Sequence, residues 1–263
     1  MGFFESIGRT VVGRWRQTRE SMAFLGETTV CVFTTLLHPR QFRFGDFALA
    51  FQRASYEGLP ITTGIGFLLG VILAFQSAAA LKMFGVEVYV SDLLAIALFR
   101  ELGPLVTAIV LAGRSGSAFA AEIGTMKVNE ELDALSTMGL PPVRFLVLPR
   151  VMAGVLAMPI LTIFAELAGL IGGAIVLEIL MVPTAVFWNH VMSITTVFMI
   201  LFGLAKGALF GLLVGLIGCS AGMRTKSTAD GVGVSATAAV VGAIVAIAVS
   251  DGLLAVFCYT WNL

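Results

Sequence analysis

Several apolar stretches of this chain are longer than the core of a globular protein requires. The stretch from Leu59 to Leu81 carries no charged residue and is long enough to cross ~30 Å of hydrocarbon as a helix. A helix satisfies its own backbone hydrogen bonds, which lipid cannot do. Comparable stretches follow at Leu93–Ala121, Phe145–Met181, Ile194–Cys219 and Ser235–Tyr259. The sequence therefore predicts an all-α polytopic membrane protein with five transmembrane helices, the third of them a single long tilted helix.

The composition and motifs argue against several classes of protein. Hydrophobic residues make up 58% of the chain and charged residues only 12%, which is unlike a soluble domain. The net charge is zero, so there is no general attraction to nucleic acid. The GxxxxGK[ST] phosphate loop, HExxH and a CxxC pair do not occur in the sequence. We therefore predict no catalytic residue, no metal site and no cofactor in this chain.

The residues before Leu59 have a different pattern. Phe4, Ile7, Val11, Trp15 and Met22 recur at helical spacing, with arginines on the other faces. This pattern predicts a helix that lies in the headgroup layer, although an amphipathic helix packed on a partner remains an alternative. We assign residues 1–58 to an N-terminal interfacial region, in which 21–37 could insert shallowly, and 59–263 to the transmembrane domain.

Basic residues indicate the orientation. Lysine and arginine precede the first stretch and lie between the second and third and between the fourth and fifth, whereas the opposite loops offer only Lys82. The positive-inside rule then places the N-terminus in the cytoplasm and the C-terminus outside.

The second stretch carries charge within the membrane. Arg100 and Glu101 precede Pro104, where we predict a kink. Arg100, Thr107 and Arg114 recur every seven residues and could present guanidinium groups to a phosphate. The alternative is that Arg100 pairs with Glu101 or Glu166 and only fixes packing. Glu166, Glu178, Lys206 and Asp251 also lie at membrane depth, and we interpret Glu178 and Lys206 as structural residues near an interface.

The segment at about 127–139 predicts a short helix outside the membrane. Asn129 is a good N-cap, Glu130 and Glu131 suit a first turn, and Gly139 with two prolines ends the helix. Asp133 is a third acidic residue of the same segment. Leu132, Leu135 and Met138 form an apolar edge, which predicts docking into a groove of another protein. The alternative is a solvated connector.

Gly203, Gly207, Gly211 and Gly215 recur at every fourth position of the fourth stretch. Such a row allows another helix to approach closely. We interpret it as tight packing within the bundle or across a dimer.

At Phe99–Gly139 (FRELGPLVTAIVLAGRSGSAFAAEIGTMKVNEELDALSTMG) and at Leu148–Pro159 the sequence resembles the MlaE-type permeases, the membrane subunits of ABC lipid transporters. The resemblance implies a homodimer in the bacterial inner membrane, with ATP and Mg bound by a cytoplasmic ABC ATPase and with a periplasmic MCE-domain ring. Phospholipid would occupy a cavity at the dimer centre, and the polar residues expected there are Arg100, Glu101, Thr107, Arg114 and Glu122. Residues Glu131 to Leu135 would form the coupling helix that enters the ATPase.

This sequence departs from the family pattern in two places. Pro141-Pro142 stands where the family often has Asp-Pro, and Val234 and Ala238 stand where it often has arginines. Two other classes of function remain open. One is a proton-coupled secondary transporter that uses Glu101, Glu166 or Asp251, and the other is a membrane scaffold without a substrate path.

Overall fold

The computed structural model describes residues 19, 22–32, 34–35 and 42–261. These residues form helices and turns, without a strand, and five of the helical segments are long and apolar enough to cross a membrane. The prediction of an all-α protein with five spans is confirmed. The helices, in chain order, are α2 (Phe44–Ser55), α3 (Leu59–Leu81), α4 (Val90–Ala97), α5 (Gly103–Leu111), α6 (Ser117–Val128), α7 (Glu131–Thr137), α8 (Leu148–Ile179), α9 (Thr184–Ile194), α10 (Val197–Met223) and α11 (Ala229–Trp261).

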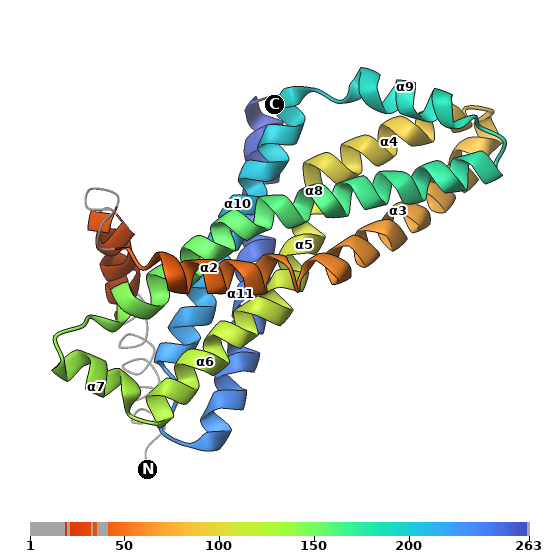
Figure 1. The fold of residues 1–263 in the computed structure, drawn as a ribbon. Helices are drawn as coiled ribbons and strands as arrows, with labels where there is room; N and C mark the ends of the chain where they lie inside the picture. Colours follow the sequence, from red (N-terminus) through yellow and green to blue (C-terminus); the bar gives the residue numbers. More distant parts are fainter. Residues whose placement is uncertain (1–18, 20–21, 33, 36–41, 262–263) are drawn as a thin grey trace, which may run out of the picture.

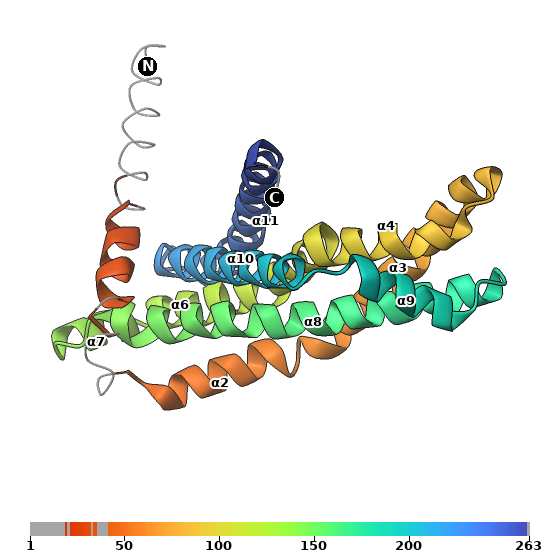
Figure 2. The same ribbon diagram turned by 90° about the horizontal axis from the view of Figure 1, so that it is seen from above.

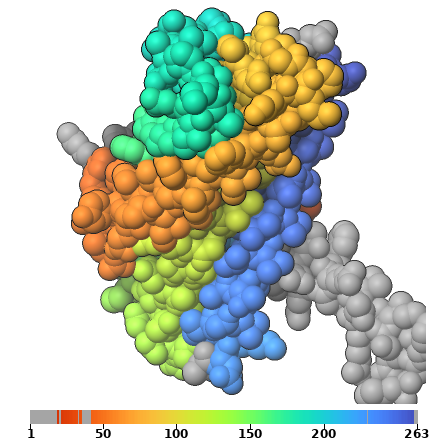
Figure 3. Space-filling model, turned by 90° about the vertical axis from the view of Figure 1, so that its right-hand side faces the viewer, coloured from red at the N-terminus to blue at the C-terminus, as the bar shows by residue number. Residues whose placement is uncertain are grey.

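Helix α8 is the centre of the bundle. It packs against α2, α3 and α10. Figure 2 shows α2 on one side of α8 and α10 on the other, while α3 crosses behind it. It is a single helix despite Pro159 in its interior, as predicted for this long stretch. By contrast, α11 is the least buried of the five spans. Figure 3 shows α11 running along the surface of the molecule beside α6.

The two ends of the bundle differ. Figure 1 places α7 and the turn between α10 and α11 at one end, with α9 and the last turns of α11 at the other. We call these the α7 end and the α9 end. Helix α9 occupies the loop between the third and fourth spans and buries Phe187 and Val191. Nδ1 of His190 lies 3.1 Å from Oδ1 of Asp92 and so links α9 to α4.

The second span is interrupted twice by π-helical turns. Leu98–Leu102 (η4) separates α4 from α5, and Ala112–Gly116 (η5) separates α5 from α6. Pro104, which has no N–H to donate, follows the first of them. The axis bends between α4 and α5 (Figure 1), which places the predicted kink at η4. π-Helical turns are rare and often occur at functional sites.

The N-terminal region is only partly described. The periodic residues from Phe4 to Trp15 lie outside the described residues, so their predicted place in the headgroup layer stays a prediction. A helix at Met22–Val32 is described, and its Phe24 contacts the core cluster that contains Phe119 and Ile123. Farther along, the boundary predicted at residue 58 falls in the turn between α2 and α3, and α2 packs against α8.

The glycine row lies on the buried face of α10. A Cβ atom on Gly211 would come within 2.3 Å of the carbonyl oxygen of Gly154 in α8, and one on Gly203 within 2.2 Å of that of Phe99. The helix backbones are therefore in direct contact at these points. Gly207 faces Thr162, and Gly215 faces Val151. In the described part of the chain, the row packs within one bundle.

Candidate functional site

Three charged side chains from three spans meet inside the bundle. The Nζ atom of Lys206 in α10 contacts a carboxylate oxygen of Glu101 in η4 and lies 2.5 Å from Oδ1 of Asp251 in α11. The Lys206 side chain is 1% exposed, whereas that of Glu101 is 35% exposed. We call these three residues the polar centre. An ammonium group buried in hydrocarbon requires such partners because an unpaired charge there is costly.

The local backbone explains how Glu101 reaches Lys206. Glu101 lies within the π-helical turn η4, where the backbone bonds to the fifth residue back rather than the fourth. The N–H of Gly103 bonds to the carbonyl oxygen of Leu98, five residues back. The carbonyl oxygen of Arg100 accepts a hydrogen bond of 3.4 Å from Nζ of Lys206. The side chain and the backbone of η4 thus both face the ammonium group.

The predicted stripe of Arg100, Thr107 and Arg114 does not face one cavity. Arg100 lines a cavity of about 210 Å³ with Phe202 and Cys258, whereas Arg114 pairs with Glu57 just after α2. Thr107 is fully buried. The prediction assumed an uninterrupted α-helix, whereas two π-helical turns rotate the three residues relative to one another. Their shared role at a lipid cavity stays a prediction.

Among the described residues, no ion pair joins Arg100 to Glu101 or to Glu166, the two carboxylates considered as its partners. Glu101 pairs with Lys206 instead. Glu166 is 2% exposed, and its carboxyl group lies against the backbone of Gly103, where a Cβ atom would come within 2.8 Å of Oε1. Glu166 is therefore close to η4 but is not part of the polar centre.

A second ionic cluster lies toward the α7 end and contains Glu122. One carboxylate oxygen of Glu122 in α6 accepts a hydrogen bond of 2.8 Å from Arg53 in α2, and the other accepts one of 3.0 Å from Arg150 in α8. Arg114 also donates to the carbonyl oxygen of Arg53 at 2.9 Å. Glu122 thus joins three helices by ion pairs. Its predicted place at a lipid cavity stays a prediction.

Helix α7 is shorter than predicted and starts later. Asn129 caps the end of α6, and Glu130 precedes α7 with a φ of 61°. The prediction of Asn129 as the N-cap was wrong because α6 continues through Val128 without a break. Glu131 and Asp133 occupy the first turn of α7, where the helix dipole favours anions.

Two of the three residues of the predicted apolar edge, Leu132 and Leu135, face the protein itself. Leu132 is 6% exposed and belongs to a core cluster, against which Leu135 packs, whereas Met138 is 65% exposed. Leu132 therefore holds α7 on the bundle and is not free to enter a partner, contrary to the docking edge that we predicted. The exposed residues Glu130, Glu131 and Asp133 remain available to another protein.

Sequence reasoning placed Lys206 near an interface and so missed it as the residue that organises the polar centre. A positive charge inside an apolar span was the available signal. Its partners could not be identified, because Lys206 and Glu101 are 105 positions apart.

Five spans around a buried ionic centre, with a short acidic helix at one end, define a multi-pass membrane permease. The chain belongs to the MlaE permease family, since the family model described as Permease MlaE matches residues 47–257. As an ABC permease, it is the non-catalytic membrane component of a transporter that also contains an ATPase subunit.

Three relatives illustrate the range of similar proteins. A probable ABC transporter permease protein of Synechocystis is 40% identical over 75% of this chain and 76% of its own length. The intermembrane phospholipid transport system permease protein MlaE of Haemophilus influenzae is 32% identical over 97% of this chain and 96% of its own. The protein TRIGALACTOSYLDIACYLGLYCEROL 1, chloroplastic, of Arabidopsis thaliana is 33% identical over 79% of this chain and 60% of its own.

Proposed function

We propose that this chain forms the membrane path of an ATP-driven transporter that moves phospholipid between the bacterial inner membrane and a periplasmic MCE-type carrier. Membership of the MlaE permease family supports this function. The relative from Haemophilus influenzae, which matches almost the whole chain, is named as a phospholipid transport permease.

The observation that carries the proposal is the unequal exposure of the polar centre. Lys206 is enclosed, but about a third of the Glu101 side chain is exposed. Glu101 thus presents a polar surface between helices while its charge is balanced by Lys206. We propose that a phospholipid headgroup contacts this surface, because a headgroup that enters the membrane interior needs polar partners.

The assembly would follow the family pattern. Two copies form a homodimer, with phospholipid in a central cavity. A cytoplasmic ABC ATPase that holds ATP and Mg binds at the α7 end, and a periplasmic MCE-domain ring binds at the α9 end. This orientation puts the N-terminus in the cytoplasm and the C-terminus in the periplasm.

Two connections would transmit a movement of α7 to the polar centre. The second span connects α7 to η4 through α6, η5 and α5. Nζ of Lys127 at the end of α6 donates to the carbonyl oxygen of Met223 at the end of α10, at 2.5 Å. An ATPase that moves α7 would therefore act on η4 and on α10, the two elements that hold Glu101 and Lys206.

The experiment is lipid transfer by the reconstituted complex of permease, ATPase and MCE protein. We expect Glu101→Gln to lower ATP-driven transfer at least about tenfold, since it removes a charge but keeps the shape of the side chain. Asp251 would still pair with Lys206, so assembly should be unchanged. Glu178→Gln, at an exposed site near the end of α8, is the matched control.

Other outcomes would favour other functions. Unchanged transfer by the Glu101→Gln variant would make that residue structural. Transfer driven by a proton gradient through this chain alone would support a proton-coupled secondary transporter. A complex that assembles, but in which photoreactive phospholipid labels no residue of this chain, would support a membrane scaffold.

A further inference from the structure

Glu166 is an acidic side chain in the middle of α8 that the polar centre does not include. The residue is 2% exposed, and no ion pair between described residues involves it. We propose that Glu166 carries its proton and positions the π-helical turn η4, so that Glu101 stays against Lys206. This proposal rests on the proposed function, because it assigns a positioning residue to the same site.

The carboxyl group of Glu166 occupies the space beside Gly103. A Cβ atom on Gly103 would come within 2.6 Å of Cγ and 2.8 Å of Oε1 of Glu166, so a larger residue at position 103 would displace the carboxyl group. Gly103 follows Glu101 by two residues, and its N–H closes the π-helical turn by bonding to the carbonyl oxygen of Leu98. Glu166 therefore contacts η4 at the residue that closes the turn.

The backbone that carries Glu166 is held from the side of α3. A Cβ atom on Gly66 in α3 would overlap the carbonyl oxygen of Ala165, and one on Gly70 would overlap that of Gly169. The backbones of α3 and α8 thus touch directly on either side of position 166. Because of these contacts, the α8 backbone at Glu166 cannot move away from η4 unless α3 moves with it.

The surroundings of Glu166 favour the neutral acid. Helices α3 and α5 carry no charged residue, and the charged residues of η4, α10 and the polar centre are Arg100, Glu101, Lys206 and Asp251. Lys206 is already shared by two carboxylates. An ionised carboxylate without a cation of its own is costly in an apolar interior, whereas a neutral carboxyl group can donate its O–H to a carbonyl oxygen.

The turn η4 depends on its neighbours for support. Pro104 follows it and has no N–H to donate, so the turn has one backbone hydrogen bond fewer than a regular helix. Lys206 in α10 donates to the carbonyl oxygen of Arg100 at 3.4 Å, and Glu166 in α8 packs on Gly103. Two neighbouring helices thus support η4 on different sides, and Glu101 lies within the turn.

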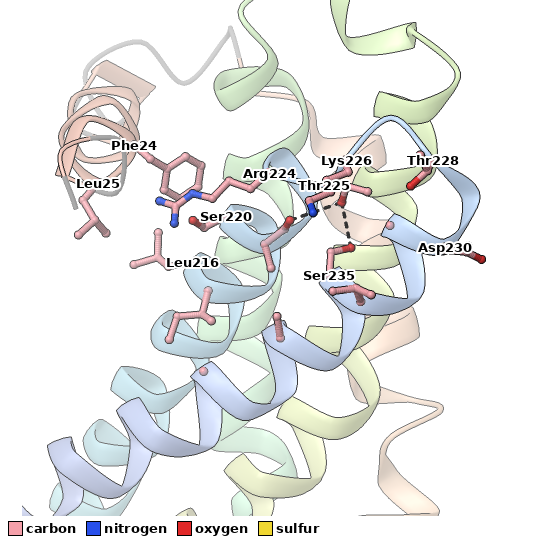
Figure 4. Close-up of a pocket in the computed structure, with 16 residues that line it drawn as sticks. Phe24, Leu25, Leu216, Ser220, Arg224, Thr225, Lys226, Thr228, Asp230 and Ser235 are labelled. Atoms are coloured by element: carbon pink, nitrogen blue, oxygen red, sulfur yellow. Dashed lines mark hydrogen bonds between the residues drawn. The ribbon is translucent and has the colours of Figure 1, made fainter. Parts of the chain in front are cut away.

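Glu166 lies outside the cavities that could hold a ligand near these helices. It does not line the cavity of about 210 Å³ that contains Arg100. It does not line the pocket of about 740 Å³ between the helix Met22–Val32 and the ends of α10 and α11 either, whose side chains are drawn in Figure 4. A residue enclosed in this way influences a bound lipid only through the elements that it touches, which makes Glu166 a positioning residue.

The first experiment tests the proton and needs no transport, so its failure would leave the proposed transport function intact. The full-length chain is reconstituted in vesicles of ether-linked phospholipid, which has no ester carbonyl group, and its infrared spectrum is recorded. A protonated carboxyl group has a C=O stretching band that a carboxylate lacks. We expect Glu166→Gln to remove such a band, and Glu178→Gln, at an exposed position of the same helix, to retain it. A band that is unchanged or absent in all three proteins would show that Glu166 is ionised and would overturn the proposal.

The second experiment measures the lipid transferred per ATP hydrolysed by the complex of permease, ATPase and MCE protein. Glu166→Gln keeps the shape and the donor of the neutral acid and should preserve this ratio. Glu166→Leu cannot donate a hydrogen bond and should lower the ratio about tenfold, whereas Glu178→Leu should leave it unchanged. A merely structural role would lower hydrolysis and transfer together, without changing their ratio. Glu166→Met takes the place of Glu166→Leu if that variant does not assemble.

A double variant tests whether Glu166 acts through Glu101. Glu166→Leu added to Glu101→Gln should lower the ratio no further than Glu101→Gln alone, because both changes remove the same contact. Multiplied effects would show that the two residues act independently and would overturn the proposal. A tenfold loss in Glu166→Gln would also overturn it, since the negative charge would then be required. Absence of transfer by the unaltered complex would instead contradict the proposed function.

Discussion

The Nζ atom of Lys206 lies 2.5 Å from Oδ1 of Asp251, so a single buried ammonium group connects the fourth and fifth spans. The same group contacts Glu101 in the second span. Because Lys206 is almost fully enclosed, its removal would leave two carboxylates without their cation.

Lys206→Met should destabilise the chain by about 3 kcal/mol, since breaking a buried ion pair leaves uncompensated charge. Thermal unfolding in detergent would measure this loss. The triple variant Lys206→Met, Glu101→Gln, Asp251→Asn should recover most of the stability, because no charge then remains unpaired. If transfer also recovered in the triple variant, the polar centre would serve only to hold the helices together.

Charge reversal at Glu130, Glu131 and Asp133 should release the ATPase or uncouple transfer, because these exposed acidic residues are what α7 presents to a partner. Co-purification of the ATPase and transfer per ATP hydrolysed would measure the effect. The stability of the permease should not change. Retention of both binding and coupled transfer would contradict the docking role of α7.

Leu132→Ala should act differently from those charge reversals. Leu132 is buried against the bundle, so its truncation should cost about 2–5 kcal/mol by leaving a cavity. We expect a lower unfolding temperature of the permease even without the ATPase. Met138→Ala, at an exposed position of the same segment, is the control and should change stability little.

Gly211→Ala should destabilise the chain by about 1–3 kcal/mol, because α8 and α10 must separate to admit the methyl group. Gly233→Ala is the matched control, since nothing lies within 4 Å of the added atom. In a helix this change should stabilise by about 0.5–1 kcal/mol. Equal unfolding temperatures for the two variants would contradict the backbone contact at Gly211.

The orientation can be tested by single cysteines in a chain whose own cysteines have been replaced. Thr137→Cys in α7 should react with an impermeant reagent only from the cytoplasm, and Met181→Cys, 90% exposed near the α9 end, only from the periplasm. Reaction of Thr137→Cys from the periplasm would place α7 on the opposite side of the membrane from the ATPase and would contradict docking between them.

The spans could be predicted from the sequence because hydrocarbon thickness and backbone hydrogen bonding allow few alternatives to a long apolar helix. Leu59–Leu81 is the predicted first span and also the observed α3. The ends of helices were less predictable where polar residues were expected to cap them. The seemingly good N-cap Asn129 ends α6 instead, and Glu130 takes a left-handed backbone conformation that its residue type does not favour.

The site could be predicted only in part, because its charges meet through tertiary packing. Glu101 was identified from its place within an apolar run, but its partners lie on spans far along the chain. The two π-helical turns have no simple signature in the sequence. With these turns in place, Arg100 lines a cavity with Phe202 and Cys258, whereas Arg114 pairs with Glu57.

The backbone contact between Gly211 and Gly154 also limits where the bundle can open. Two main chains that touch leave no side chains between them that could change rotamer, so we expect α8 and α10 to move together. A passage for a lipid tail then requires displacement of a more loosely held helix. We expect α11, the least buried of the five spans, to be the helix that moves.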